Sequence, residues 1–248
     1  MQTVRRGAFV WKLRYPDLDG DWLRHPERLL KEMQSVRKRP SSSPQTRVVR
    51  FKWNERDLVV KEYDRRRWRT IGRALVRGPR SLQAFKIALR LEQLGIPGIR
   101  AIAAGYKGGQ PWYSLLVTEE IRDVLPLYTW LKHSRESLKP VVHSAARLFA
   151  GLHNAGLIHR DAHETNFVVP QNRRRELIMV DVDGVRESRR VTLRQAAKDL
   201  SRLHVRLRDL ISTTTRLRFL AEYSRLRCPK VSSREVIKAF AAIGTRLR

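Results

Sequence analysis

The stretch His-Arg-Asp-Ala-His-Glu-Thr-Asn at residues 159–166 carries the most specific chemistry in this sequence. An apolar run follows it and leads to Asp181, in the segment LIMVDVDG at residues 177–184. Phosphoryl transfer needs a carboxylate that orients the attacking hydroxyl and accepts its proton, together with an Asn and an Asp that hold Mg²⁺ on the phosphates. Asp161, Asn166 and Asp181 supply these groups in that order, so the segment predicts phosphoryl transfer.

The pattern H-R-D-x-x-x-x-N is typical of the catalytic loop of protein kinases, in which a later Asp binds metal. Upstream, Lys61 in the strand-like run VVKEY matches the strand lysine that contacts the α- and β-phosphates of ATP. The alternative for Lys61 is a solvated lysine on an edge strand. Glu119 lies at the end of another strand-like run, where the backbone of an inter-lobe hinge would bond adenine. Together these features are far more specific than His-Arg-Asp alone.

Hydrophobic periodicity predicts an α+β fold around these motifs. Four β-branched and aromatic runs predict antiparallel strands: residues 47–53, 57–63, 99–105 and 112–118. A helical repeat spans residues 81–94 and ends at Gly95, whereas the later sequence is mainly helical, over 138–156 and 193–211. We therefore expect a two-lobed, protein-kinase-like fold with a small N-lobe of antiparallel sheet plus one helix and a mainly helical C-lobe.

Composition shifts predict three parts. The basic segment 1–45 is expected to be an N-terminal extension, with a helix from Pro26 to about Arg39 and the turn-rich stretch RPSSSPQT at its end. Residues 46–122 then form the N-lobe. Residues 123–248 form the C-lobe, with the catalytic loop at 159–166.

Several segments resemble the lipopolysaccharide core kinase family, bacterial enzymes that phosphorylate Kdo or heptose sugars on a protein-kinase-like fold. The resemblance covers residues 47 to 225 and rests on four segments: 81–101, which ends a helix in LGIP; GLHNAGLIHRDAHETN; KDLSRLH at 198–204; and RLRFL at 216–220, before Tyr223. It implies an ATP-dependent kinase that acts on a sugar hydroxyl of the lipopolysaccharide core.

The resemblance also implies roles for individual residues. Asp161 would be the catalytic base, and Asn166 and Asp181 would hold Mg²⁺, with Mn²⁺ as the alternative ion. Lys61 would clamp the phosphates of ATP. Asp183 is expected to cap a turn rather than support a second metal ion.

In similar kinases an aspartate on the helix after the metal-binding strand accepts hydrogen bonds from the catalytic-loop backbone. Asp199 would have this structural role here and would hold His159 and Arg160 in place.

Two features depart from the family pattern. The helix at 81–94 has Ala84 where similar kinases carry a glutamate that pairs with the strand lysine. Residues 40–50 contain no glycine, so the phosphates would be covered by Ser41–Ser43, Gln45 and Thr46. Backbone amides and hydroxyls still bind phosphate oxygens without glycine.

Charge indicates a polyanionic partner. The 248 residues carry 52 Lys and Arg against 24 Asp and Glu, a net charge of +28. An anionic membrane surface, a phosphorylated acceptor such as lipopolysaccharide core, and nucleic acid all fit this charge. The alternative is an arginine-rich composition on a solvated surface. Nucleic acid is not favoured, because RNP-type, KH and zinc-finger patterns are missing from the sequence.

Arginine runs at 65–67, 173–175 and 189–190 would suit anionic headgroups. The single cysteine, Cys228, excludes an intramolecular disulfide and fits a reducing compartment. Because the sequence also lacks a signal-peptide core and an apolar stretch of spanning length, we expect a cytoplasmic protein at the inner membrane, attached peripherally. No motif assigns a role to residues 1–40. No motif sets the oligomeric state.

Two other function classes stay open as alternatives. One is a kinase of the same fold that acts on a protein Ser, Thr or Tyr or on a small molecule. The other is a catalytically weak pseudokinase or basic polyanion-binding module, which Ala84 and the glycine-free loop favour. Zinc chemistry at His153, His159 and His163 is disfavoured because their spacing fits no zinc motif, and serine hydrolysis lacks a G-x-S-x-G element.

Overall fold

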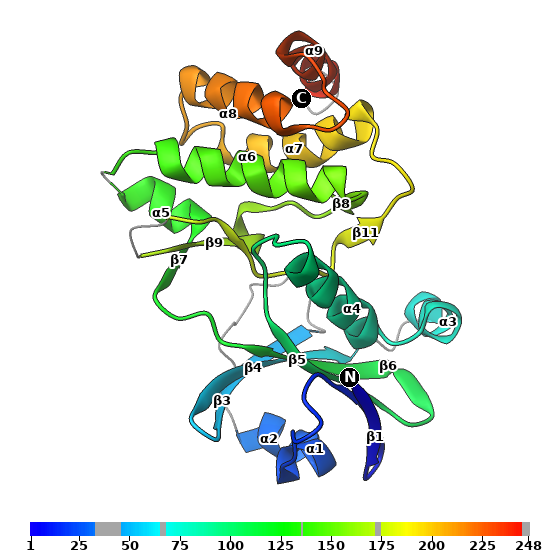
Figure 1. The fold of residues 1–248 in the computed structure, drawn as a ribbon. Helices are drawn as coiled ribbons and strands as arrows, with labels where there is room; N and C mark the ends of the chain where they lie inside the picture. The colour runs from blue at the N-terminus through cyan, green and yellow to red at the C-terminus, as the bar shows by residue number, and fades with distance from the viewer. Residues whose placement is uncertain (33–45, 65–67, 135, 172–174, 245–248) are drawn as a thin grey trace. The chain divides into compact units, whose positions relative to one another are not determined.

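A computed structural model describes residues 1–32, 46–64, 68–134, 136–171 and 175–244. The chain forms two compact units, each with its own secondary structure (Figure 1). Unit 1 contains residues 1–90 and 99–121, and unit 2 contains residues 91–98 and 122–248. The six-stranded sheet lies in the first unit, and the second unit is mainly helical.

Unit 1 is built on a six-stranded antiparallel sheet in the order β1-β2-β5-β6-β4-β3. Its strands are β1 (Gln2–Arg6), β2 (Phe9–Leu13), β3 (Thr46–Trp53), β4 (Arg56–Asp64), β5 (Ala101–Lys107) and β6 (Gln110–Glu119). The strands β3 to β6 correspond to the four predicted ones. In the pairing of β4 with β6, Lys61 lies opposite Leu116 and Leu58 opposite Glu119.

The N-terminal segment is part of this sheet, whereas the sequence placed residues 1–45 in an extension outside the N-lobe. The strands β1 and β2 form a hairpin, and β2 pairs with β5 from Phe9 opposite Lys107 to Leu13 opposite Ala103. Phe9, Trp11 and Leu13 are buried and alternate with half-buried residues. One face of β2 therefore covers the core, which makes residues 2–13 an integral part of the unit.

Four helices accompany the sheet: α1 (Asp21–Arg24), α2 (Pro26–Glu32), α3 (Trp68–Arg77) and α4 (Arg80–Gln93). The helix α2 begins at Pro26 as predicted, and the rest of the helix expected to Arg39 lies outside the described residues. The helix α4 matches the predicted one and buries Ala84 and Phe85. The sequence predicted the helices at Pro26 and at residues 81–94, so α1 and α3 are additions.

Unit 2 consists mainly of helices, namely α5 (Leu127–His133), α6 (Lys139–Asn154), α7 (Leu193–Leu207), α8 (Thr213–Leu226) and α9 (Ser233–Gly244). The helix α6 buries an apolar stripe that includes Phe149 and Leu152 at helical spacing. The helix α7 begins at a capping box, in which Thr192 and Gln195 satisfy each other's backbone N–H groups. Among the described helices, none has the length and apolar content needed to cross a bilayer.

Short strands of unit 2 flank the catalytic loop. They are β7 (Val124–Pro126), β8 (Leu157–His159), β9 (Phe167–Pro170), β10 (Ile178–Met179) and β11 (Val185–Glu187). The strands β10, β9 and β7 form one small sheet, and β11 pairs with β8 in another. The loop therefore leaves β8 and returns to β9 through the 3₁₀ turn η1 (Glu164–Asn166).

Candidate active site

The catalytic loop and the predicted metal-binding aspartate meet at one end of the β9–β10 pair. Asn166 immediately precedes β9, and Asp181 is the second residue after β10. Phe167 lies opposite Met179, and the Val180 N–H donates to the Asn166 carbonyl at 2.9 Å. The strand pairing thus brings together two residues that are well separated in the sequence.

Asn166 has the geometry of a metal ligand. Its side-chain Nδ2 donates to the carbonyl of Asp161 at 2.7 Å, which fixes the orientation of the amide. The residue is 2% exposed, and its Oδ1 is buried with no hydrogen-bond partner among the described residues. A buried amide oxygen without a partner is costly, and oxygen is the ligand that Mg²⁺ prefers. The residues present therefore fit a magnesium ion.

Asp181 closes a turn that continues from β10. Its Oδ1 accepts a hydrogen bond from the Asp183 N–H at 3.0 Å, an arrangement that Asp side chains commonly form with the second residue after them. The carbonyl of Asp183 accepts from the Arg186 guanidinium at 2.8 Å. Asp183 lies in this turn, and the cap is the carboxylate of Asp181, which accepts the Asp183 N–H.

His159 links the catalytic loop to the segment that carries Asp181. Its Nε2 donates to the Asp181 carbonyl at 2.9 Å, and its Nδ1 accepts the Asp161 N–H at 3.3 Å. This pattern requires the neutral ring, since the cation has no acceptor nitrogen. Burial lowers the pKa of His159, consistent with that state. The neutral imidazole thus connects the backbones of Asp161 and Asp181.

A buried network on the other side of the loop centres on Asp199 of α7. The side chain of Asp199 is fully buried, and its Oδ2 accepts the His159 N–H at 2.6 Å. His153 Nε2 lies 3.3 Å from the same oxygen, and His153 Nδ1 lies 2.7 Å from the Tyr223 hydroxyl. Burial lowers the pKa of His153 and raises that of Tyr223. A neutral His153 then donates to Asp199 and accepts from Tyr223, so α6, α7 and α8 all support the loop.

Arg160 is held differently from the expectation. Its N–H donates to the Gly184 carbonyl at 3.1 Å, not to Asp199. The reason is the turn after Asp181, which brings Gly184 against the loop. A Cβ atom at Gly184 would lie 2.8 Å from the Asp161 Cβ and 3.0 Å from His159 Nδ1. Only glycine permits this close approach.

Lys61 and Glu119 belong to unit 1. The Lys61 ammonium lies 5.5 Å from the centroid of the Tyr63 ring, on the same strand. Ala84 is 3% exposed on α4, and the neighbouring Gln83 donates its side-chain amide to the carbonyls of Arg77 and Gly78. Of the predicted phosphate-covering residues, Ser41–Ser43 and Gln45 lie outside the described residues, and Thr46 is the first residue of β3.

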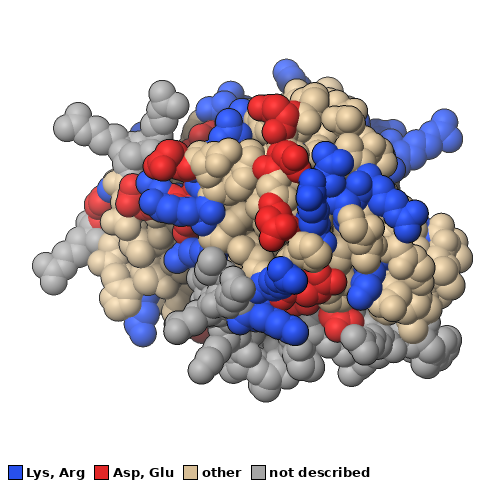
Figure 2. All heavy atoms as spheres, turned by 90° about the horizontal axis from the view of Figure 1, so that it is seen from below, with Lys and Arg blue, Asp and Glu red and all other residues tan. Residues whose placement is uncertain are grey.

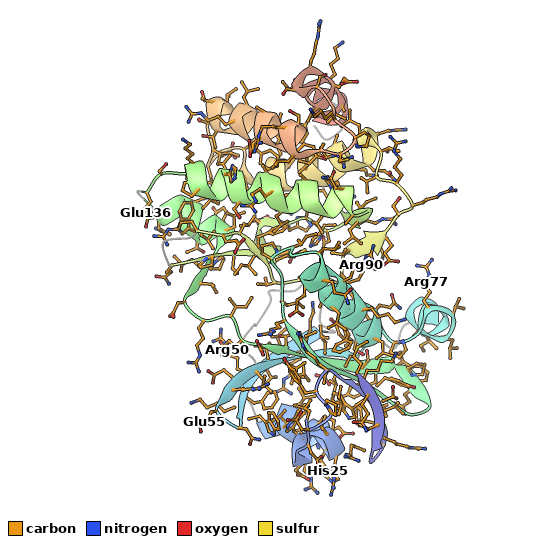
Figure 3. All side chains as sticks on the ribbon, viewed as in Figure 1. His25, Arg50, Glu55, Arg77, Arg90 and Glu136 are labelled. Carbon is orange, nitrogen blue, oxygen red and sulfur yellow. The ribbon has the colours of Figure 1, made fainter. Side chains whose placement is uncertain are left out.

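The end of β6, where the sequence predicts the inter-lobe hinge, forms backbone hydrogen bonds with other parts of unit 1. The Glu119 N–H donates to the Arg100 carbonyl, and the Glu120 N–H donates to the Asp57 carbonyl, both at 2.9 Å. An adenine contact through either N–H would have to replace one of these bonds. Arg50, labelled in Figure 3, forms an ion pair of 2.5 Å with the Glu120 carboxylate.

On one face of the molecule, basic residues are mixed with acidic ones. On the face shown in Figure 2, Lys and Arg side chains lie on both sides of a band of Asp and Glu. Arg175, at the end of one predicted arginine run, binds the carboxylate of Glu136, labelled in Figure 3. Arg189 and Arg190 are exposed, whereas the run at 65–67 lies outside the described residues.

Three residues of the site carried no role in the sequence-based prediction. His153 was weighed only as a zinc ligand, Tyr223 only as part of the family resemblance, and Gly184 not at all. The segment GLHNAGLIHRD contains His153 six residues before His159, and the turn Asp-Val-Asp-Gly contains Gly184. These were the available signals, but the partners of all three residues become evident only in the folded chain.

A family model described as the lipopolysaccharide kinase (Kdo/WaaP) family matches residues 21–223. The chain belongs to this family. Its members are kinases, so the predicted phosphotransferase class is confirmed at the level of the family. The match includes all the predicted site residues and begins within the segment that was expected to be an extension.

A curated relative supports the assignment. The lipopolysaccharide core heptose(I) kinase WaaP of Pseudomonas aeruginosa is 27% identical over 157 residues, which is 58% of this chain and 59% of that protein. The matched part thus spans less than two thirds of the relative.

Solved structures confirm the protein-kinase-like fold. WaaP in complex with acyl carrier protein has a TM-score of 0.68 at 23% identity and covers 95% of each chain. The bifunctional kinase-methyltransferase WbdD has a TM-score of 0.54 at 15% identity and covers 86% of this chain and 47% of its own.

Proposed function

We propose that this protein is an ATP-dependent kinase that phosphorylates a sugar hydroxyl, on Kdo or heptose, of the lipopolysaccharide core. The observation that carries the proposal is the buried Oδ1 of Asn166, which has no partner among the described residues and lies in a loop with Asp161. Family membership supports the acceptor class. The alternative acceptors, a protein side chain or a small molecule, would use the same loop.

In the proposed reaction Asp161 is the base. Its carboxylate accepts the proton of the sugar hydroxyl while the hydroxyl oxygen bonds to the γ-phosphorus. The bond from this phosphorus to the β–γ bridging oxygen breaks, and ADP leaves with that electron pair. Asn166 and Asp181 would hold Mg²⁺, which neutralises charge on the phosphates when bound. Lys61 would bind the α- and β-phosphates, and the backbone at Glu119 would contact adenine.

The first experiment measures phosphate transfer from ATP to lipopolysaccharide core acceptors with Mg²⁺ or Mn²⁺. Asp161→Ala and Asp181→Ala should each lower transfer by at least about a hundredfold, because each removes a positioned base or a metal ligand. Asp209→Ala is the control, since its side chain is 88% exposed and pairs only with the neighbouring Arg208 among the described residues. A wild-type protein that binds ATP without transferring phosphate to any acceptor would contradict the proposal.

The pseudokinase alternative is favoured by one observation, the buried Ala84 on α4. In a pseudokinase, nucleotide binding and turnover would both be weak or missing in the wild-type protein. Titration of ATP by calorimetry, with and without Mg²⁺, separates this case from a kinase tested on the wrong acceptor. An active kinase should bind ATP more tightly when the metal is present.

We also propose that the enzyme works at the cytoplasmic face of the inner membrane. The net charge of +28 supports this location, since each Lys or Arg near an anionic surface contributes about 1 kcal/mol. Residues 2–13 do not form a separable anchor, because β1 and β2 are strands of the sheet. Co-sedimentation with phosphatidylglycerol vesicles should exceed that with phosphatidylcholine and should fall with salt. Tighter binding to RNA at the same ionic strength would contradict the proposal.

An acyl carrier protein is a proposed partner. The structure of WaaP in complex with acyl carrier protein supports it, together with a cavity of about 240 Å³ within unit 2. The cavity is almost entirely apolar, and its lining includes Leu131, Val142, Leu203, Leu220 and Phe240 from five helices. An apolar cavity of this kind suits the acyl chain that such a carrier presents.

Binding of acylated and unacylated acyl carrier protein tests this partnership. Ala145 lines the cavity on α6, so Ala145→Phe should fill part of it and weaken binding of the acylated form about tenfold. His143→Ala, on the exposed side of the same helix, should leave binding unchanged. Equal affinity for the two carrier forms would exclude the cavity as the acyl site.

A further inference from the structure

The side chain of Asp161 is mostly exposed, so its neighbours do little to fix its orientation. It is 59% exposed, and its carboxylate has a single recorded side-chain partner within the described part of the chain. That partner is His163, whose Nε2 lies 2.9 Å from Asp161 Oδ1. The side chain of His163 is itself 38% exposed.

The backbone of the loop fixes where His163 lies. Its N–H donates to the Asp161 carbonyl at 2.8 Å, and its carbonyl accepts the Asn166 N–H at 2.9 Å. His163 has an extended backbone, with φ −87° and ψ 151°. Ala162, between the two polar residues, is fully buried. The bond from the His163 N–H to the Asp161 carbonyl closes a tight turn, and the buried Ala162 lies between two side chains that both reach solvent.

A general base must present one carboxylate oxygen to the hydroxyl in a narrow range of geometries. A freely rotating aspartate would spend much of its time in other rotamers. One hydrogen bond to Oδ1 restricts the rotation and leaves Oδ2 to accept the hydroxyl proton. Either ring state of histidine that carries a proton on Nε2 can make this bond.

We propose that His163 is a positioning residue for the base, and that it acts by holding Oδ1 of Asp161 through its Nε2–H. The inference rests on the proposed function, in which Asp161 accepts the proton of the acceptor hydroxyl. His163 then contributes to the rate of transfer and not to the binding of nucleotide.

Steady-state kinetics of His163→Ala and His163→Gln test this role. His163→Ala should lower kcat by about 10- to 100-fold while KM for ATP changes less than about twofold. The Gln side chain places an amide N–H near the position of Nε2, so His163→Gln should recover most of the lost kcat. The control is His143→Ala, because the exposed His143 of α6 also pairs with a carboxylate, with its Nδ1 3.0 Å from Glu222 of α8.

A double-mutant cycle shows whether His163 acts through Asp161. In the Asp161→Ala background, His163→Ala should cause no further loss of kcat. If His163→Ala retains wild-type kcat, or if its loss is as large in the Asp161→Ala background, the inference fails while the proposed function stands. If the wild-type protein transfers no phosphate, the proposed function fails and this inference fails with it.

Discussion

The two units of this kinase-family protein support their predicted site residues to very different degrees. In unit 2, the fully buried Asp199 accepts the His159 N–H, and His159 in turn bonds the backbones of Asp161 and Asp181. In unit 1, Lys61 lies on its strand while α4 carries Ala84 instead of the expected glutamate. Unit 2 therefore holds the residues proposed for phosphate transfer through a connected set of buried hydrogen bonds, whereas α4 of unit 1 has an apolar residue at the expected glutamate position. We therefore expect substitutions in unit 2 to have the larger effects.

The largest effect is expected from Asp199→Ala. The substitution leaves the buried His159 N–H without its acceptor and removes the partner of His153. Loss of a buried charged acceptor should lower the free energy of unfolding by about 3 kcal/mol, and phosphate transfer should fall with it. Urea unfolding measures the change, and Asp209→Ala provides an exposed control. An effect below about 1 kcal/mol would show that the network does not hold the loop.

Gly184→Ala tests the same region without removing any polar group. The new Cβ would lie 2.8 Å from the Asp161 Cβ, so the base must move or the turn must open. We expect kcat to fall about a hundredfold, equivalent to about 2.7 kcal/mol, while ATP affinity is retained. Gly72→Ala is the matched control, because a Cβ there would meet nothing within 4 Å. Unchanged kcat in Gly184→Ala would mean that the position of Asp161 is not critical.

Lys61→Met tests the other side of the comparison. Because the substitution removes the ammonium proposed to bind the α- and β-phosphates but leaves the proposed base and metal ligands in place, we expect a modest effect, with KM for ATP raised about tenfold or about 1.4 kcal/mol. Lys52→Met, an exposed lysine on the neighbouring strand β3, should have no effect. A loss of kcat as large as that of Asp181→Ala would show that Lys61 is held as firmly as the residues of unit 2.

The smallest effect concerns the pH dependence of stability. Burial lowers the pKa of both His153 and His159 in the folded chain. Below about pH 6.5 the unfolded chain takes up protons on these side chains that the folded chain does not, so stability should fall as the pH falls. Each histidine contributes at most about 1.4 kcal/mol per pH unit. Urea unfolding at pH 7.5, 6.5 and 5.5 measures the slope, and His153→Gln should reduce it. A stability that rises toward low pH would contradict the neutral state of these rings.

Local patterns in the sequence predicted a large part of the fold. The strands around Lys61 and the helix that carries Ala84 follow from hydrophobic periodicity, and the loop from His159 to Asn166 follows from its motif. These signals are local, because each depends on residues within one segment. The alternation of buried residues in Phe-Val-Trp-Lys-Leu is equally local and predicts β2, but the basic composition of the N-terminal segment obscured it.

Long-range partners could not be predicted in the same way. The Arg160 N–H bonds to Gly184 and not to Asp199, because the turn after Asp181 brings that glycine to the loop. The contact between His153 and Tyr223 joins two helices seventy residues apart. Such pairs depend on how the helices pack, and a single sequence carries no periodic signal for them.

The pairing of β2 with β5 also has a consequence for synthesis on the ribosome. Trp11 packs so closely over Gly105 that a Cβ at this glycine would lie 2.5 Å from the Trp11 ring. The N-terminal hairpin leaves the exit tunnel long before β5, and β2 cannot complete its pairing until Lys107 has been translated. During that interval β2 lacks its partner strand, and Phe9, Trp11 and Leu13 lack the rest of the core that buries them. Pairing between strands so far apart in sequence is slow, so the nascent chain is exposed to aggregation until β2 and β5 meet.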